Sequence, residues 1–166
     1  MKPYLKNLDD VEWTEMSHGK RFHSLRKPLT PKDGTRPKLG ASVYRLLPGK
    51  RSFPRHEHMV NDEAILVLQG EGTLIYGDEE VALRAGDYVH LPANSGAAHQ
   101  VHNTSAAELE YLCFSTMIEP EISLYPDSDK IGAFAGSAPG GDITRRRVWA
   151  YMKSHTLPYW EGESEE

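Results

Sequence analysis

The chain has 166 residues, 39% of them hydrophobic, and a formal net charge of −5 at pH 7, which is typical of one globular domain. The negative charge excludes a general electrostatic attraction to nucleic acid or to anionic membranes. Cys113 is the only cysteine, so an internal disulfide is excluded and a reducing compartment is favoured. Residues 1–10 lack an apolar core of signal-peptide length and no apolar run could span a membrane, so we expect a cytoplasmic protein.

The first part of the chain, residues 1–38, is polar and interrupted by prolines. This composition predicts an irregular N-terminal extension. Within it, residues 11–14 favour a short edge strand, which could pair with a sheet of its own chain or of a second copy.

Residues 39–117 consist of strand-forming runs separated by glycine turns. The predicted strands are 42–47, 64–68, 73–76, 81–83, 88–91, 99–103 and 109–116. The continuously apolar run 64–68 is typical of a strand buried on both faces, and Gly77-Asp78 between apolar runs indicates a hairpin. Short strands at near-regular spacing predict an antiparallel sandwich or barrel.

Residues 118–166 are less regular and predict an irregular C-terminal extension, with a turn at 125–129 and a glycine-rich loop at 135–141. Large apolar residues between 149 and 159 could cover a face of the barrel. We therefore predict one domain over the whole chain, with the barrel between the two extensions.

Two histidines, His56 and His58, stand at positions i and i+2. On an extended strand such side chains point to the same face, so both imidazoles can aim at one point. Glu63 has the wrong parity for an unbroken strand, so the segment before it must bend if Glu63 is to reach that point. Imidazole and carboxylate together suit a borderline divalent metal. His99, on a predicted neighbouring strand, is the candidate for a further ligand.

Two ordered motifs in this sequence resemble those of the cupin family. The first motif comprises Gly49, His56, His58, Glu63 and Gly70, and the second comprises Gly86, Pro92, Gly96, His99 and Asn103. The first has six residues before the first histidine where the usual pattern has five. The second has three residues between proline and glycine where the usual pattern has one. Both departures are small length changes in loops, and every ligand position is filled.

The resemblance implies a cupin-type double-stranded β-helix, which is an all-β jelly-roll barrel, formed as a single cupin domain over residues 1–166. It also implies one divalent metal ion per chain, Zn, Mn, Fe or Ni, at one end of the barrel. The implied metal ligands are His56, His58, Glu63 and His99.

A divalent ion with open coordination positions can polarise a carbonyl or hydroxyl group, and small single-domain cupins of this kind are similar to sugar-phosphate-isomerase-like proteins. We therefore expect a metal-dependent enzyme acting on a small polar metabolite, with sugar or sugar-phosphate isomerisation favoured and Glu63 as catalytic acid or base. Redox-active iron would instead support a dioxygenase. Fold alone does not decide function. Two alternatives to an enzyme therefore stay open: a non-catalytic cupin that binds a small molecule, and a structural role in which the metal only stabilises the barrel.

Two further residues are candidates for substrate contact. Tyr111 shares a strand face with Cys113 and Ser115 and could line a pocket beside the metal, although such residues are more often part of the core. Arg45 could hold a carboxylate or phosphate of the substrate, although solvent exposure is the simpler interpretation of a single arginine.

Association between copies of the chain is also expected. A small barrel leaves apolar edge strands exposed unless something covers them. We expect a homodimer in which the N-terminal segment around Trp13 is exchanged between chains, as in many cupins.

Overall fold

The computed structural model describes residues 3–153 and 156–164, and over these residues the chain forms β-strands and short 3-10 turns, without an α-helix. The strands are β1 (Thr14–His18), β2 (Phe22–Pro28), β3 (Leu39–Leu46), β4 (Glu57–His58), β5 (Glu63–Gln69), β6 (Glu71–Tyr76), β7 (Glu79–Arg84), β8 (Tyr88–Leu91), β9 (His99–His102), β10 (Leu109–Thr116), β11 (Glu121–Tyr125), β12 (Lys130–Ala135) and β13 (Val148–Lys153). The 3-10 turns are η1 (Leu8–Asp10), η2 (Pro126–Ser128) and η3 (Ile143–Arg145). The predicted all-β fold is confirmed. Within the described residues, no helix is long and apolar enough to cross a membrane.

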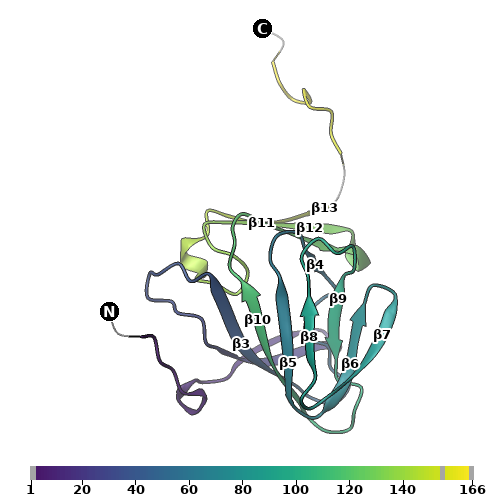
Figure 1. The fold of residues 1–166 in the computed structure, drawn as a ribbon. Helices are drawn as coiled ribbons and strands as arrows, with labels where there is room; N and C mark the ends of the chain where they lie inside the picture. Colours follow the sequence, from purple (N-terminus) through teal and green to yellow (C-terminus); the bar gives the residue numbers. More distant parts are fainter. Residues whose placement is uncertain (1–2, 154–155, 165–166) are drawn as a thin grey trace.

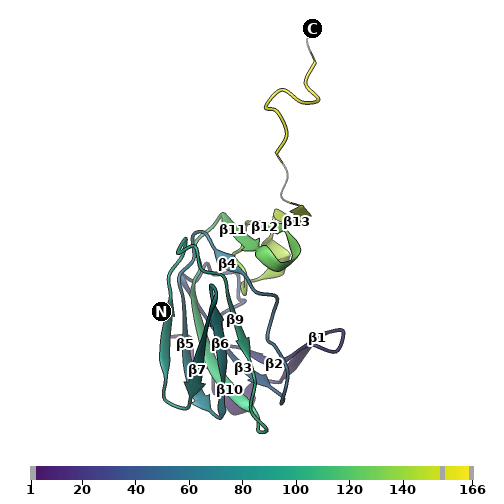
Figure 2. The ribbon, with the colours of Figure 1, turned by 90° about the vertical axis from the view of Figure 1, so that its right-hand side faces the viewer.

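The strands form three antiparallel sheets with the orders β1-β2-β3-β10-β5-β8, β7-β6-β9 and β13-β12-β11-β4. Figures 1 and 2 show the first two sheets as the walls of a barrel, with the four-stranded sheet lying across its upper end. Gly77, at a φ of +58°, turns the chain between β6 and β7, so the predicted hairpin is confirmed.

The hydrophobic core fills the barrel away from the four-stranded sheet. Its buried members are Leu46, Ile65, Val67, Leu74, Leu83, Leu91, Val101, Leu109 and Tyr111. Along β5, Ile65 and Val67 are buried, whereas Leu66 is only partly buried and Leu68 is 40% exposed. The prediction that this strand is buried on both faces is therefore wrong, because the barrel wall has only its inner face in the core.

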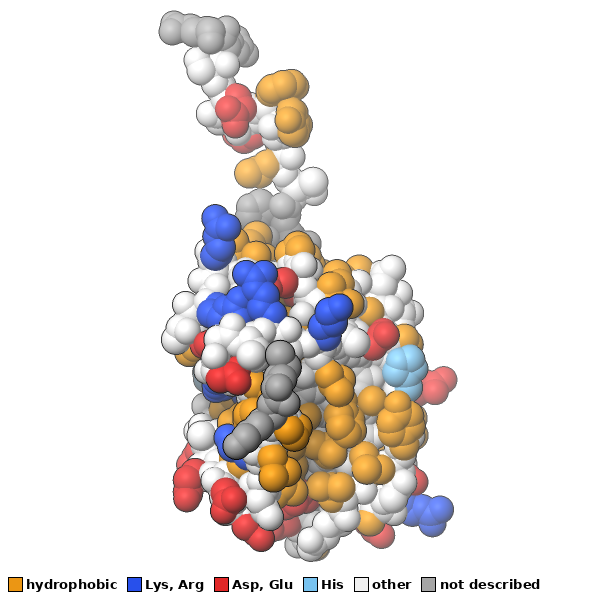
Figure 3. Space-filling model, turned by 60° about the vertical axis from the view of Figure 1, so that its left-hand side comes forward, with side chains coloured by type: hydrophobic (Ala, Val, Ile, Leu, Met, Phe, Trp, Pro, Cys, Tyr) orange, Lys and Arg blue, Asp and Glu red, His pale blue; other side chains and the backbone are white. Residues whose placement is uncertain are grey.

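Side chains on the outer face of the barrel wall form an apolar surface. Leu66, Leu68, Tyr88, Leu112 and Phe114 alternate with inward residues on β5, β8 and β10, and each is at least partly exposed. We call these five residues the outer apolar face. Figure 3, which brings the left-hand side of Figure 1 forward, shows hydrophobic side chains gathered over this side of the molecule.

Both extensions are more regular than the sequence predicts. In the N-terminal extension, β1 begins at Thr14 and forms a hairpin with β2, which pairs with β3 of the same chain. The Trp13 ring lies under the cations of Lys27 and Arg45 of this chain. In the C-terminal extension, β11, β12 and β13 form most of the sheet that crosses the barrel end.

Candidate metal centre

Four predicted ligand residues come together at the barrel end below the four-stranded sheet. His56 precedes β4 and His58 ends it, while Glu63 begins β5 and His99 begins β9. One ligand atom from each lies within 4.8 Å of the other three, in a group that could hold a metal ion. The side chain of Glu63 keeps 16% of its surface exposed, so the group is reachable from solvent.

Backbone pairing holds the histidines in this arrangement. The amide of His56 donates to the carbonyl of His99 at 3.1 Å, and the amide of His99 donates back at 2.7 Å. The two side chains therefore start from directly opposed backbone positions, and their ring centroids are 4.6 Å apart.

The bend expected before Glu63 is present, and Asn61 fixes it. Asn61 is 1% exposed, and its side-chain oxygen accepts a hydrogen bond from the amide of Ile118 at 2.7 Å. Its side-chain nitrogen donates to the carbonyl of Ile118 at 2.9 Å. Because these bonds tie the bend to the segment before β11, β5 begins with Glu63 directed at the histidines.

Contacts inside and outside the group orient the imidazole rings. Nδ1 of His56 lies 2.9 Å from the carbonyl oxygen of Pro54, which can only accept, so Nδ1 carries the proton and Nε2 keeps its lone pair. Nε2 of His58 lies 3.5 Å from Oε1 of Glu63, and Nε2 of His99 lies 3.1 Å from Oε2 of the same carboxylate. An imidazole held through one nitrogen with the other turned inward is the usual arrangement of a metal-binding histidine.

The charges of the group suit a cation. Burial raises the pKa of Glu63, but the hydrogen bond from His99 and the nearby histidines outweigh it and lower the pKa to about 2. Burial, with His99 and His58 nearby, lowers the pKa of His56 to about 3. At neutral pH Glu63 is therefore ionised and His56 is neutral, which are the forms that bind metal.

Glu121 supports the group and was missed by sequence reasoning. Its carboxylate is fully buried and accepts hydrogen bonds from the amides of Met59 and Asn61, both at 3.0 Å. It also lies 3.6 Å from Nδ1 of His58. Burial lowers the pKa of His58, but Glu121 and Glu63 outweigh this and raise it. The sequence carries no signal for this role, because the alternation on β11 would ordinarily place Glu121 and Ser123 outward.

The structure does not bring the predicted substrate contacts, Tyr111 and Arg45, to the group. Tyr111 pairs with Val67, well beyond Glu63 along β5, and it is 3% exposed within the barrel core. Arg45 follows the inward-facing Tyr44 on β3, so it lies on the outer side of the sheet, where its guanidinium pairs with Glu110 at 3.0 Å. Successive side chains of a strand point to opposite faces, so Arg45 points outward because Tyr44 points inward.

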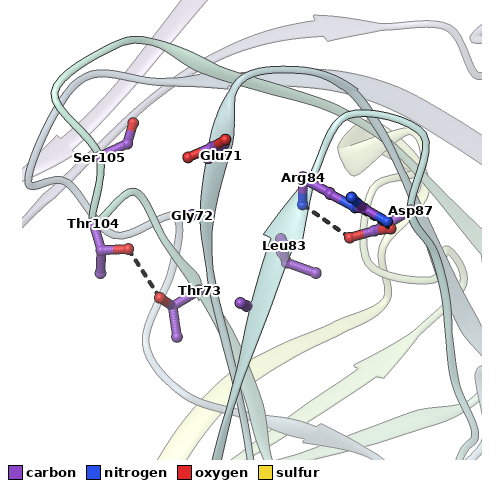
Figure 4. Close-up of a pocket in the computed structure, with 9 residues that line it drawn as sticks. Glu71, Gly72, Thr73, Leu83, Arg84, Asp87, Thr104 and Ser105 are labelled. Carbon is purple, nitrogen blue, oxygen red and sulfur yellow. Dashed lines mark hydrogen bonds and ion pairs between the residues drawn. The ribbon is translucent and has the colours of Figure 1, made fainter.

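A cavity of about 490 Å³ lies at the opposite end of the β6–β7 hairpin. It is lined by Glu71, Gly72, Thr73, Ala82, Leu83, Arg84, Asp87, Thr104 and Ser105. Figure 4 shows two hydrogen bonds within this lining: the hydroxyls of Thr73 and Thr104 bond each other, and the carboxylate of Asp87 accepts from the backbone amide of Arg84. Because β6 reaches His99 only at its other end, at Tyr76, this cavity is separate from the candidate metal centre.

Comparisons with known proteins agree with this architecture. Residues 42–115 match the family model of the cupin domain. The chain is similar to a protein from Silicibacter pomeroyi, whose crystal structure is described as that of a sugar phosphate isomerase from a cupin superfamily. The two share 25% identity and a TM-score of 0.72, over 89% of this chain and 90% of that one. The chain is also similar to a protein provisionally described as a sugar phosphate isomerase from Acidithiobacillus ferrooxidans, with 25% identity and a TM-score of 0.64 over 81% of each chain.

A third similar structure, described as a predicted oxalate decarboxylase from Thermotoga maritima, has 21% identity and a TM-score of 0.60 over 69% of this chain and 99% of that one. At this identity the likeness supports the fold alone. No curated protein matches the chain. This chain therefore carries a cupin domain over residues 42–115, and it shares its barrel with a protein of the cupin superfamily.

Proposed function

We propose that this chain is a divalent-metal-dependent isomerase of a sugar or sugar phosphate. The observation that carries the proposal is the group of three imidazoles and one ionised carboxylate at the solvent-reachable end of the barrel. The two similar structures described as sugar phosphate isomerases support this reaction class over the other chemistries open to a cupin.

The residues present fit a divalent ion. His56, His58 and His99 would supply neutral nitrogen donors and Glu63 an anionic oxygen, a set that suits Zn, Mn, Fe or Ni. A divalent ion bound there supplies a residual positive charge that polarises a carbonyl or hydroxyl oxygen of the substrate. Glu121, held by backbone amides, keeps the ring of His58 turned toward Glu63.

Glu63 is the proposed proton carrier. In an aldose–ketose exchange, its carboxylate takes the proton from the hydroxyl-bearing carbon next to the carbonyl and returns it to the former carbonyl carbon, while a hydroxyl proton passes from one oxygen to the other. A carboxylate with a pKa of about 2 is a weak base, so this step requires a carbon–hydrogen bond already acidified by polarisation of the neighbouring carbonyl. A single carboxylate can do both transfers because the two carbons are adjacent.

Isotope exchange tests the proposal. Protein purified without a histidine tag is loaded with Mn, Fe, Ni or Zn and incubated with aldose and ketose phosphates in deuterated water. We expect deuterium at the carbon next to the carbonyl with at least one metal, and exchange at least ~10²-fold slower with the Glu63→Gln variant. The exposed His90 provides a control, His90→Gln, which should exchange like the native protein.

A lack of deuterium for every metal and substrate would contradict isomerisation. Oxygen consumption by the iron-loaded protein would then favour a dioxygenase. Ligand binding without conversion would favour a small-molecule-binding cupin.

A further inference from the structure

Arg26 lies on the inner face of the barrel wall, and its side chain runs toward the end that holds the candidate metal centre, because it bonds Ser42, which is nearer than Tyr44 to the level of Glu63 in the strand pairing. Arg26 lies opposite Tyr44 in the β2–β3 pairing, and Tyr44 lies opposite the buried Tyr111 in the β3–β10 pairing. All three side chains therefore share the inner face of the sheet. The guanidinium carbon lies 5.8 Å from the centre of the Tyr44 ring, and Nε donates to the hydroxyl of Ser42 at 3.0 Å.

Arg146 approaches from the sheet that crosses the barrel end. Its guanidinium carbon lies 5.3 Å from the centre of the Phe134 ring and 4.7 Å from that of Trp149. Its Nε is buried and has no hydrogen-bond partner within residues 3–153 and 156–164. A buried donor without a partner is costly, and a ligand acceptor would satisfy it.

The two guanidinium groups meet at one loop. Arg26 donates to the carbonyl of Gly140, and Arg146 donates to the carbonyl of Ala138, both at 3.3 Å. Burial and the nearby positive charge of Arg26 lower the pKa of Arg146, whereas Tyr151 opposes this change. Two like charges are thus held close together in a partly buried place.

Neither arginine has a counter-ion among the residues that the structure describes. Other arginines of this chain do: Arg45 pairs with Glu110, and Arg55 with Asp127. Partly buried cations without a partner are unfavourable, and the attraction of an anion placed between them would offset their desolvation cost and their mutual repulsion. A phosphate monoester, with two negative charges and several acceptor oxygens, suits two guanidinium groups better than a planar carboxylate does.

The guanidinium groups of both arginines lie toward the end of the barrel that holds the metal centre. A row of aromatic rings connects His56 with Arg146. The ring of Tyr125 stacks on that of His56 at 5.8 Å and contacts the ring of Tyr151. Tyr151 in turn contacts Phe134, whose ring lies beneath the guanidinium of Arg146.

On the other side, β2 is three strand spacings from β5, roughly 14 Å between backbones. The long side chain of Arg26 narrows this gap by extending from the level of Val67 toward that of Glu63. A phosphorylated sugar chain can bridge such a span.

We propose that Arg26 and Arg146 form the phosphate subsite of this protein, so that its substrate is a phosphorylated rather than a neutral sugar. This assignment rests on the proposed function for the identity of the ligand. Phosphate binding itself does not require turnover, so the two proposals fail separately.

Calorimetry with inorganic phosphate tests the subsite on chelator-treated, metal-free protein, because phosphate cannot then bind through a metal. We expect the native protein to bind phosphate, and Arg26→Gln and Arg146→Gln each to weaken binding by about 10-fold or more, the range for charge-assisted hydrogen bonds. The matched control is Arg84→Gln, at the opposite end of the barrel, which should bind like the native protein. Acetate should bind more weakly than phosphate.

Lysine variants keep the test decisive if a glutamine variant does not fold. Arg26→Lys and Arg146→Lys retain the charge and most of the side-chain stem, and they should weaken phosphate binding because a single ammonium cannot replace the guanidinium fork. In turnover, both should raise the KM for a sugar phosphate while leaving the KM for the unphosphorylated sugar unchanged. The proposal is overturned if metal-free native protein does not bind phosphate, if acetate binds equally well, or if all four variants bind phosphate like the native protein.

Discussion

The fully buried carboxylate of Glu121 lies 3.6 Å from Nδ1 of His58, while the other nitrogen of the same ring lies 3.5 Å from Glu63. A histidine held between an outer carboxylate and a metal site has a fixed ring orientation and a more basic inner nitrogen. Glu121 can play this part because the amides of Met59 and Asn61 satisfy its oxygens.

Replacing Glu121 should weaken metal binding. Glu121→Gln keeps the shape of the side chain but removes the charge next to His58, and we expect a loss of about 10- to 100-fold in metal affinity. Competition with a chelator of known affinity measures the change. The exposed Glu80 offers the control Glu80→Gln, and equal affinity of the two variants would contradict the role given to Glu121.

Removal of two ligands should abolish metal binding. His56→Ala combined with His58→Ala leaves two of the four donor groups, too few to hold a divalent ion firmly. Elemental analysis should find no bound metal, while circular dichroism should still show a folded β-protein. Full metal occupancy of this variant would refute the assignment of the site.

The stability of the metal-free protein should depend on His56 in acid. The folded-state pKa of about 3 is below the ordinary value of 6.5, so unfolded chains bind a proton at His56 that folded chains do not. The contribution of His56 to stability is therefore present above pH 6.5 and is lost as the pH falls toward 3. The raised pKa of His58 acts in the opposite direction. The effect of His56 is therefore measured as the difference in the free energy of unfolding between the native protein and a His56 variant.

Denaturant unfolding of native and His56→Gln protein at several pH values gives this difference. The free energy of unfolding of the native protein should fall relative to that of the variant between pH 6.5 and 3. A difference that stays constant over this range would show that His56 is not held neutral by its surroundings.

The outer apolar face should join two copies of the chain. Its side chains carry no charge, so the same surface on a second copy can cover it through a two-fold contact without charge complementarity. Leu68→Glu should shift the protein from dimer to monomer at tens of micromolar, as measured by light scattering. Val81, 42% exposed on β7 in another sheet, gives the control Val81→Glu, and a monomeric native protein would contradict the prediction.

The ligand set could be predicted from sequence because it depends on local rules. The i, i+2 spacing of His56 and His58 sets their common face, and the position of His99 after a glycine turn places it on an adjacent strand. Glu63 required a bend, which Asn61 provides through contacts with residues far along the chain. Sequence predicts that such a bend must exist but does not identify its long-range partners.

The supporting residues could not be predicted because they reverse the usual pattern. On β11 the polar residues Glu121 and Ser123 are fully buried, while the apolar Ile122 is 37% exposed. Alternation normally places apolar residues inward, so the segment suggested no buried role for Glu121. The burial follows from pairing with β4, which is a tertiary contact.

The choice between arginines also depended on pairing. Arg45 was the sequence candidate, but it follows an inward-facing residue on β3 and so lies outside. Arg26 lies inside because β2 pairs with β3 in a register that opposes it to Tyr44. The sequence shows neither this pairing nor the approach of Arg146, which is 120 positions further along the chain.

The most direct test of the account is the turnover of Glu63→Gln at saturating metal. This change keeps the shape of the side chain but removes the ionised carboxylate that both binds the ion and carries the proton. With bound metal verified by elemental analysis, we predict a loss of at least ~10²-fold in the rate of sugar phosphate isomerisation, the usual contribution of a general base. Native-like turnover by the metal-loaded Glu63→Gln variant would contradict the account.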